Sequence, residues 1–544
     1  MKKCTPNVTL LVKRIDIVGM AICVALLSAS AAWAVADRSE EPVQILGASL
    51  PDFAGESIQD LALFRYDDVG GVFEPIPFQI DERIVDRVFK QGTGFEFTET
   101  IYDIYGEDDG LLDADDELVF LFGDTGPQAP VDTPWPGGAS AERYEIEIND
   151  PRTGAPVADQ YVYLFGGTGL AISPTSYVTW PILAEAVVTT PVFSLDYEDK
   201  WLLVGLDVAT PCGTGVDLLD RVKGRGGLAG PDTGETEQNW NNGSPPVNST
   251  FMGGLVGPVR AIRYIMGALS GVNTIHHDRV YRGLWERHTD LRVHPVSRAY
   301  LYFDWFPPAG ATLYLPGDPS GLAVDGTQET PTGWGACPTP VPGACGPIPD
   351  WALYRSSAGG MVIFLELPPS PFYNSAGAYF LDDDQYNDKT TLVPTYLDDD
   401  DSAYDLGIVL EGPGGNGIDE SIFSRWSVYP LCADTGDATV GADYREFVDS
   451  PLGVSTLAQF EVLGRIESVT AGIDGDDVVL EWQAMGGATS YRIYASEFPD
   501  LPRNTWTSLG DTPTPDFRDT GAALAATARH YSVVAIGAGG EGDH

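Results

Sequence analysis

The segment DIYGEDDGLLDADDELVF, residues 103–120, is dense in carboxylates and runs into an apolar stretch. In a calcium loop of the EF-hand type, oxygen ligands stand at positions 1, 3, 5, 9 and 12, and a glycine at position 6 makes the sharp turn. With Gly110 at position 6, ligand positions 3, 5, 9 and 12 fall on Glu107, Asp109, Asp113 and Asp116. Position 1 falls on Tyr105, so Asp103 or Asp108 would have to supply that oxygen. The segment therefore predicts either a degenerate calcium loop or a solvated acidic turn before a strand.

A second chemically suggestive stretch runs from Arg260 to Arg298, where seven arginines face only three acidic residues. It also contains four of the six histidines of the chain, at positions 276, 277, 288 and 294. If WERHTDLRVH is an extended strand, one face carries Glu286, His288, Asp290, Arg292 and His294, because strand side chains alternate.

Two interpretations of this strip remain open. His288 and His294 would move protons while Arg260 and Arg292 neutralise an anionic sugar, which would make the protein a polysaccharide lyase or hydrolase. The simpler interpretation is the wet side of an amphipathic strand, the default for an antiparallel sheet. A zinc site is disfavoured, because the spacing of His288 and His294 fits no strong motif and neighbouring arginines oppose a cation.

The overall charge limits the classes of partner. The chain of 544 residues has a formal net charge of −48. Such a protein repels nucleic acid and anionic membranes, which bind through clustered Lys and Arg. Divalent cations, calcium above all, suit the acidic runs, including those at 382–384 and 398–401; solubility alone also explains acidic surfaces.

The start of the chain has the pattern of a secretory signal peptide, residues 1–36, with Lys and Arg followed by an apolar core and small residues. We therefore expect an exported protein, secreted, periplasmic or on the cell surface. No later stretch is long and apolar enough to predict a transmembrane anchor. Four cysteines follow the signal segment, and the short Pro-rich spacing favours Cys337–Cys345, which leaves Cys212 for Cys432.

The elements that would position these residues are strands. Short β-branched and aromatic runs bounded by Gly and Pro recur, namely RYEIEI, QYVYLFG, KWLLVGLDV, RAYLYFDWF, GMVIFLEL and DLGIVLEG. They predict an all-β protein with a large multi-stranded antiparallel sandwich region. We assign this region to residues 37–465, with a possible subdomain boundary near 225–250.

The C-terminal segment, residues 466–544, has a different pattern of aromatic and aliphatic residues. Trp482 falls in an expected second strand, Tyr491 and Ile493 alternate in a third, and Tyr531, Val533 and Ala535 alternate near the end. This pattern resembles a fibronectin type III domain, which implies a small β-sandwich that serves as a spacer or binding module. The resemblance calls for about eight more residues after GEGDH, so we expect the module to lack its last strand.

The larger region resembles uncharacterised exported bacterial β-rich proteins in PFQIDER, LLDADDELVF, DLLDRVKGR and GPVRAIR. GPVRAIR and YFLDDD are also similar to segments of the two-sheet sandwiches of sugar epimerases and polysaccharide lyases. Without a strong catalytic motif, the sequence favours a non-catalytic recognition or structural protein. We expect it to bind carbohydrate or a surface protein, with calcium-stabilised acidic loops; the polysaccharide-active enzyme is the alternative. The sequence gives no indication of oligomeric state.

Overall fold

The computed structural model describes residues 38–89, 96–131, 133–152, 159–198, 200–227, 235–236, 249–267, 275–291, 298–308, 310–337, 343–369, 373–384, 403–411, 422–433, 436–460, 465–466, 468–485, 488–499, 505–525, 528–537 and 540–541. Within these ranges the protein is mostly β, as predicted, with one α-helix, α4 (Ala438–Asp449). Short 3-10 helices occur at η1 (Gly47–Ser49), η2 (Pro51–Phe53), η3 (Ile58–Asp60), η4 (Phe122–Asp124) and η7 (Ala522–Leu524). Over the same residues, no helix combines the length and apolar character needed to cross a bilayer.

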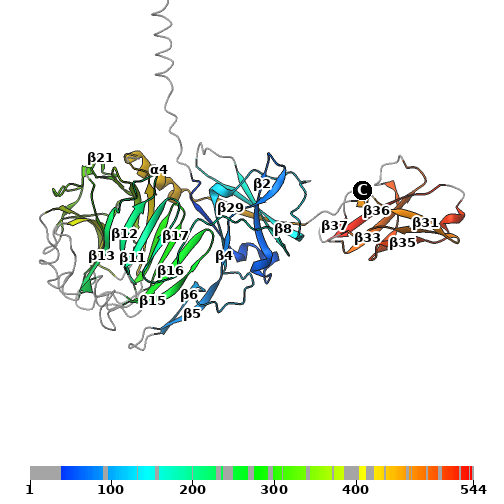
Figure 1. Ribbon diagram of the computed structural model, residues 1–544, viewed down its shortest axis with the longest axis horizontal. Helices are drawn as coiled ribbons and strands as arrows, with labels where there is room; N and C mark the ends of the chain where they lie inside the picture. Colours follow the sequence, from blue (N-terminus) through cyan, green and yellow to red (C-terminus); the bar gives the residue numbers. More distant parts are fainter. Residues whose placement is uncertain are drawn as a thin grey trace, which may run out of the picture.

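The N-terminal unit is a sandwich of two antiparallel sheets (Figure 1). One sheet has the order β29 (Gly453–Phe460), β8 (Ala139–Asn149), β9 (Gln160–Gly167), β2 (Leu61–Asp67) and β3 (Val72–Pro75). The other has the order β1 (Pro42–Leu46), β7 (Glu117–Leu121) and β4 (Gln79–Asp81). Alternate residues of both sheets, such as Ile45, Leu118, Ile146 and Leu164, form one buried core. A hairpin of β5 (Arg83–Phe89) and β6 (Glu96–Tyr102) follows β4.

The larger unit packs three antiparallel sheets around a single core. Its nine-stranded sheet has the order β15 (Thr250–Val256), β16 (Arg260–Met266), β17 (Ile275–Tyr281), β18 (Trp285–Leu291), β28 (Ile422–Leu431), β25 (Gly360–Glu366), β24 (Ala352–Arg355), β20 (Thr312–Leu315) and β21 (Asp318–Ala323). Its seven-stranded sheet has the order β14 (Glu235–Thr236), β13 (Leu219–Gly227), β19 (Arg298–Trp305), β27 (Ala403–Glu411), β26 (Ser375–Asp383), β23 (Ala344–Gly346) and β22 (Gly335–Ala336). The third sheet contains β10 (Ala186–Thr189), β11 (Phe193–Glu198) and β12 (Leu202–Val208).

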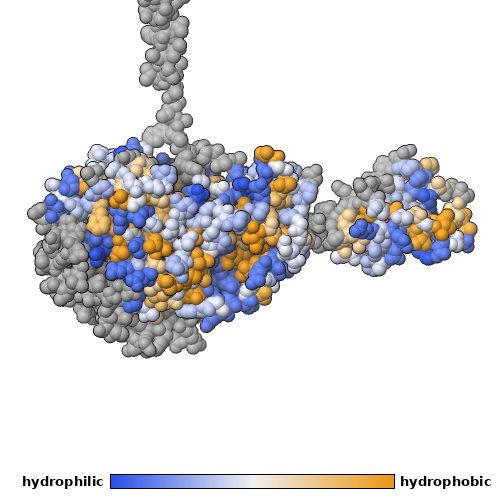
Figure 2. Space-filling view, in the orientation of Figure 1, coloured by the Kyte–Doolittle hydropathy of each residue, from blue (hydrophilic) through white to orange (hydrophobic). Residues whose placement is uncertain are grey.

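The six apolar runs of the sequence all form strands, namely β8, β9, β12, β19, β25 and β27. Period-two alternation decides which face each residue takes. On β19, for example, Leu301 and Phe303 enter the common core, whereas Tyr300 and Tyr302 lie on the opposite face of the sheet. In the orientation of Figure 2, hydrophilic and apolar residues are mixed, and apolar ones gather over β15 and β16.

The C-terminal unit lies at one end of the molecule in Figure 1. One of its sheets contains β30 (Arg465–Ile466), β36 (His530–Gly537), β33 (Ser490–Ser496), β34 (Thr507–Thr512) and β37 (Gly540–Glu541), and the other contains β31 (Thr470–Asp474), β32 (Asp477–Glu481) and β35 (Asp516–Asp519). The residues expected to form its core do so, with Trp482, Tyr491, Ile493, Val533 and Ala535 in one buried cluster. Membership in the fibronectin type III family stays a prediction, as do the domain boundaries.

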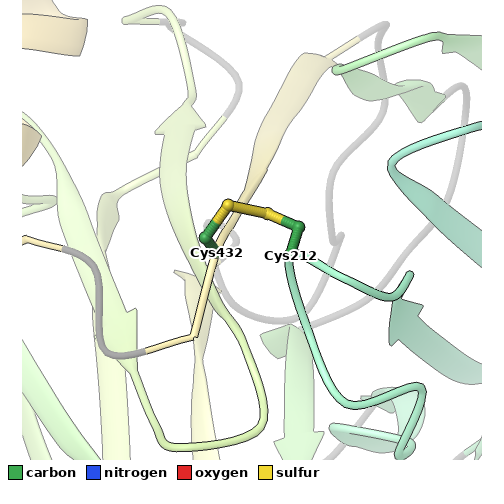
Figure 3. The surroundings of a disulfide bond; sticks show 2 residues. All are labelled: Cys212 and Cys432. Carbon is green, nitrogen blue, oxygen red and sulfur yellow. A yellow bond between two sulfur atoms is a disulfide. The ribbon is translucent and has the colours of Figure 1, made fainter.

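Both expected disulfides are present. Cys212 pairs with Cys432 across 220 residues of sequence, joining the segment after β12 to the end of β28 (Figure 3). Cys337 pairs with Cys345 across only eight residues. Two disulfides fit an oxidising, extracytoplasmic environment, although residues 1–36, the predicted signal peptide, lie outside the described part of the chain.

Candidate functional site

The face of the nine-stranded sheet that points away from the common core carries a continuous group of titratable side chains. Ala261, Val280 and Trp285 point into the core, so their sequence neighbours on β16, β17 and β18 point to the outer face. We call the resulting group the histidine face and define it by seven residues: Tyr264, His277, Arg279, Glu286, His288, Glu366 and Arg425.

Strand register lines up these side chains across the sheet. Tyr264 is paired with His277, His277 with His288, His288 with Arg425, and Arg425 with Glu366. A neighbouring row pairs Arg279 with Glu286. Because directly opposed side chains in adjacent strands lie about 5 Å apart, the consecutive strands β16, β17 and β18 build one continuous site with the distant strands β28 and β25.

The rings in the first row stack. The imidazoles of His277 and His288 are 4.5 Å apart and within 7° of parallel. Tyr264 stacks on the other side of His277 at 5.0 Å, and Phe423 lies 5.7 Å from His288. The row is closed at the Tyr264 end, which packs with Tyr102 of β6, and open at Phe423, which is 42% exposed.

Glu286 is the anionic centre of the histidine face. Its carboxylate lies 3.5 Å from His288 Nε2 and 3.9 Å from Arg425 Nη1. Burial alone would raise the pKa of Glu286, but His288, Arg279 and Arg425 outweigh it and lower the pKa to about 2. Glu286 is therefore ionised at any physiological pH. Arg425 also binds Glu366, with 2.6 Å between Nη2 and Oε2.

The two histidines of the row are held neutral. Burial, followed by the repulsion of nearby Arg279, lowers the pKa of His288 although Glu286 opposes the shift. Burial and the neighbouring His288 and Arg279 lower the pKa of His277 well below its usual range. Among the described residues, no hydrogen-bond partner is found for His277 Nε2 or Arg279 Nε, whereas His288 Nε2 lies beside the Glu286 carboxylate. Buried polar atoms are usually paired, so two unpaired nitrogens next to this pair indicate a place for a polar ligand.

The candidate residues of the segment WERHTDLRVH fall partly on the histidine face. Glu286 and His288 lie together on the outer face, and both are over 90% buried, so the solvated interpretation does not describe them. Asp290 follows on the same strand at the next outward position. Arg292 and His294 lie outside the described residues. His277 and Arg279 share the two-residue spacing and were detectable in IHHDRV, whereas Glu366 and Arg425 reach the site only through tertiary pairing.

Arg260 has a different place from the one expected of a catalytic residue. It is completely buried where β16 meets the N-terminal unit. Its guanidinium donates to Asp81 at 2.8 Å, to Glu117 at 2.9 Å and to Tyr281 Oη at 3.0 Å. With all these bonds formed, Arg260 connects the two units rather than facing a ligand.

The opposite face of the same strands also contains buried charge. Arg287 forms a bidentate pair with Asp278, at 2.8 and 3.0 Å, and Trp285 Nε1 donates to the same carboxylate. His276 bonds to Trp201 and Thr289. These groups bond to one another inside the core, on the face opposite to the histidine face.

In the acidic loop, the structure brings together a set of carboxylates different from the expected one. Gly110 has φ +75°, the left-handed turn assumed for position 6. Both oxygens of Asp116 accept backbone N–H groups, from Arg83 and Asp113, and Asp103 accepts those of Tyr105 and Asp108. The carboxylates that come within 4.8 Å of one another are those of Glu82, Asp108 and Asp109. Glu107 and Asp113 are exposed outside that group.

Calcium binding at this loop stays a prediction, with a direct thermal test. Burial and the charges of Asp108, Asp103 and Asp109 raise the pKa of Glu82, and a bound cation would relieve this repulsion. We expect calcium to raise Tm and a chelator to lower it, because a ligand at about 100 times its Kd stabilises by about 2.7 kcal/mol. Asp109→Ala is expected to abolish the difference, whereas Asp115→Ala, a carboxylate of the same loop outside the group, keeps it. Identical melting curves with calcium and chelator would contradict the prediction.

Comparisons with known proteins do not assign the chain to a family. No protein-family model matches the chain, and no curated protein is similar to it in sequence. Among solved structures, an α-mannosidase from Enterococcus faecalis aligns with 81% of this chain at 11% identity and a TM-score of 0.38; the chain spans 48% of that protein. A putative aldose 1-epimerase from Escherichia coli (47% of this chain, 99% of the epimerase) and a heparan sulfate lyase HepC mutant from Pedobacter heparinus (58% and 42%) align at 9% and 8% identity, both with a TM-score of 0.26. Likeness at this level transfers no activity.

Proposed function

We propose that the protein is an exported carbohydrate-active enzyme whose histidine face carries out general acid–base chemistry on a sugar. The observation that carries this proposal is the His288 imidazole, held 3.5 Å from the ionised Glu286, with the unpaired nitrogens of His277 and Arg279 beside it. A neutral imidazole oriented by a carboxylate can act as a general base, and perturbed titratable groups gathered on one face are typical of functional sites.

A sugar fits the remaining features of the face. At the open end of the row, Phe423 is 42% exposed and offers a ring to the apolar side of a pyranose. Arg279 and Arg425 donate to hydroxyl or ring oxygens, and Glu366 accepts from hydroxyls. In this arrangement His288 takes a proton from the sugar, and Glu286 stabilises the imidazolium that forms.

The test combines a screen with a variant. The protein is incubated in D₂O with neutral and uronate-containing oligosaccharides, and NMR follows deuterium incorporation at sugar carbons and the appearance of new products. For any substrate found, His288→Gln is expected to lower kcat/KM by about 100- to 10,000-fold, the usual contribution of a general base. His530→Gln, in the C-terminal unit, is the matched control and should leave the rate unchanged.

The pH profile separates proton transfer from mere positioning. Activity should fall as pH drops through the pKa of His288, which lies below the usual value of about 6.5. Glu286→Gln removes the charge that favours the protonated imidazole, so this limb should move to lower pH. Binding of saccharide without any turnover would refute the enzyme and leave the non-catalytic recognition protein expected from the sequence.

A further inference from the structure

A cavity of about 320 Å³ lies at one end of the histidine face. Its walls come from the end of β25, with Glu366, Leu367 and Pro368, from the segment Ile348–Asp350, and from Arg445 of α4. α4 is held there by Val440 and Tyr444, which pack with Trp351, Leu353 and Phe364 of the sheet. The volume is at the lower end of small-ligand sites, about 300–1,000 Å³.

Glu366 belongs to both the cavity and the histidine face. It lines the cavity, and its carboxylate binds Arg425, which in turn lies 3.9 Å from Glu286. Glu366 is on β25 and His288 on β18, two strands away, so the cavity and the imidazole row are roughly 10 Å apart across the sheet. A ligand seated on the histidine face would therefore reach the cavity by extending along the row, across Arg425.

The charge of the combined surface favours a neutral ligand. Arg425 is paired with Glu366, Arg279 and Arg425 both neighbour Glu286, and Arg445 binds Asp449 at 2.8 Å and lies beside Asp350. These described groups leave no excess of positive charge, in a protein with a net charge of −48. The cavity wall mixes Ile348, Pro349 and Pro368 with charged groups, which suits the alternating apolar and hydroxyl surfaces of a sugar.

We propose that this cavity is a second sugar-binding subsite, so that the ligand is a neutral oligosaccharide chain running from the histidine face to α4. The inference rests on the proposed function and names its substrate class. Arg445 and Glu366 bind the distal unit by donating to and accepting from its hydroxyls, while the proximal unit lies on Phe423 beside His288.

Calorimetry with a series of gluco-, manno- and xylo-oligosaccharides of two to six units tests the proposal. For one series we expect affinity to rise at least about tenfold between the shortest and longest chains, equivalent to about 1.4 kcal/mol. Arg445→Ala should remove most of this gain and affect the shortest chain far less, because Arg445 lines the cavity and is not part of the histidine face. Arg492→Ala, which removes a partly buried arginine of the C-terminal unit, is the control and should bind saccharides as wild type does.

The outcomes distinguish this inference from the proposed function. If the shortest chain binds and His288→Gln reduces its turnover, but affinity does not grow with chain length or Arg445→Ala keeps the gain, the second subsite is refuted alone. Tighter binding of oligogalacturonates than of every neutral series overturns the assignment of a neutral chain. Absence of saccharide binding by the wild-type protein overturns both proposals.

Discussion

Replacing Arg260 by Met is expected to lower the free energy of unfolding by about 3–5 kcal/mol, because removing one partner of a buried ion network leaves uncompensated charge. Arg260 is fully buried and satisfies Asp81, Glu117 and the hydroxyl of Tyr281 at once. Methionine keeps much of the volume, so the expected loss reflects the two stranded carboxylates rather than a cavity. Urea denaturation followed by tryptophan fluorescence measures the effect.

The penalty should depend on pH in a defined direction. Burial alone would raise the pKa of Glu117, but Arg260 outweighs it and lowers the pKa. A lowered carboxyl pKa stabilises the fold at pH values above about 4.3, the ordinary pKa of Glu. This contribution is lost as pH falls through the lowered pKa of the folded state. Without Arg260 the carboxyl can protonate at little cost, so the difference between Arg260→Met and wild type should shrink towards pH 4.

A compensated variant provides the control. Arg260→Met with Asp81→Asn and Glu117→Gln removes the guanidinium charge together with the charges of its two carboxylate partners, and much of the lost stability should return. A loss below about 1 kcal/mol for Arg260→Met alone, or no recovery in the triple variant, would show that the network contributes little.

The all-β architecture could be predicted because alternation is a local signal. In runs such as RYEIEI and RAYLYFDWF, the alternation of residue types alone predicts that the segment is a strand and which of its side chains share a face. The disulfides could be predicted for a similar reason, since only four cysteines follow the signal segment and two of them are eight residues apart. Sheet order could not, because it depends on which distant strands pair, as when β18 at 285–291 joins β28 at 422–431.

The candidate site, too, is partly predictable from local sequence and partly dependent on the pairing of distant strands. The common face of Glu286 and His288 follows from spacing within one strand, and so does that of His277 and Arg279. The two pairs are brought into contact by the register of β17 with β18. Arg425 and Glu366 belong to strands more than 70 residues further along the chain. Arg260 looked catalytic because its charge is unusual in so acidic a chain, whereas its partners Asp81 and Glu117 lie some 140 or more residues earlier.

In the acidic loop, the spacing of the carboxylates in the sequence does not show which of them come together. A linear ligand pattern assigns Asp116 to the ion, but a carboxylate beside unpaired backbone N–H groups caps them first, as Asp116 and Asp103 do here. Glu82, which joins Asp108 and Asp109, lies in PFQIDER, more than twenty residues before the loop, so no local motif could include it.

Removing the Cys212–Cys432 disulfide with a double Cys→Ser substitution is expected to cost about 4–5 kcal/mol, whereas removing Cys337–Cys345 should cost about 2–3 kcal/mol. The reason is the size of the loop that each bond closes, 220 residues against eight. A long closed loop removes more conformational freedom from the unfolded chain. The shorter bridge is therefore the matched control, because it changes the same chemistry in the same large unit. Urea denaturation of both variants measures the difference, and equal losses would mean that local packing around the sulfurs, rather than chain entropy, determines the contribution of each bond.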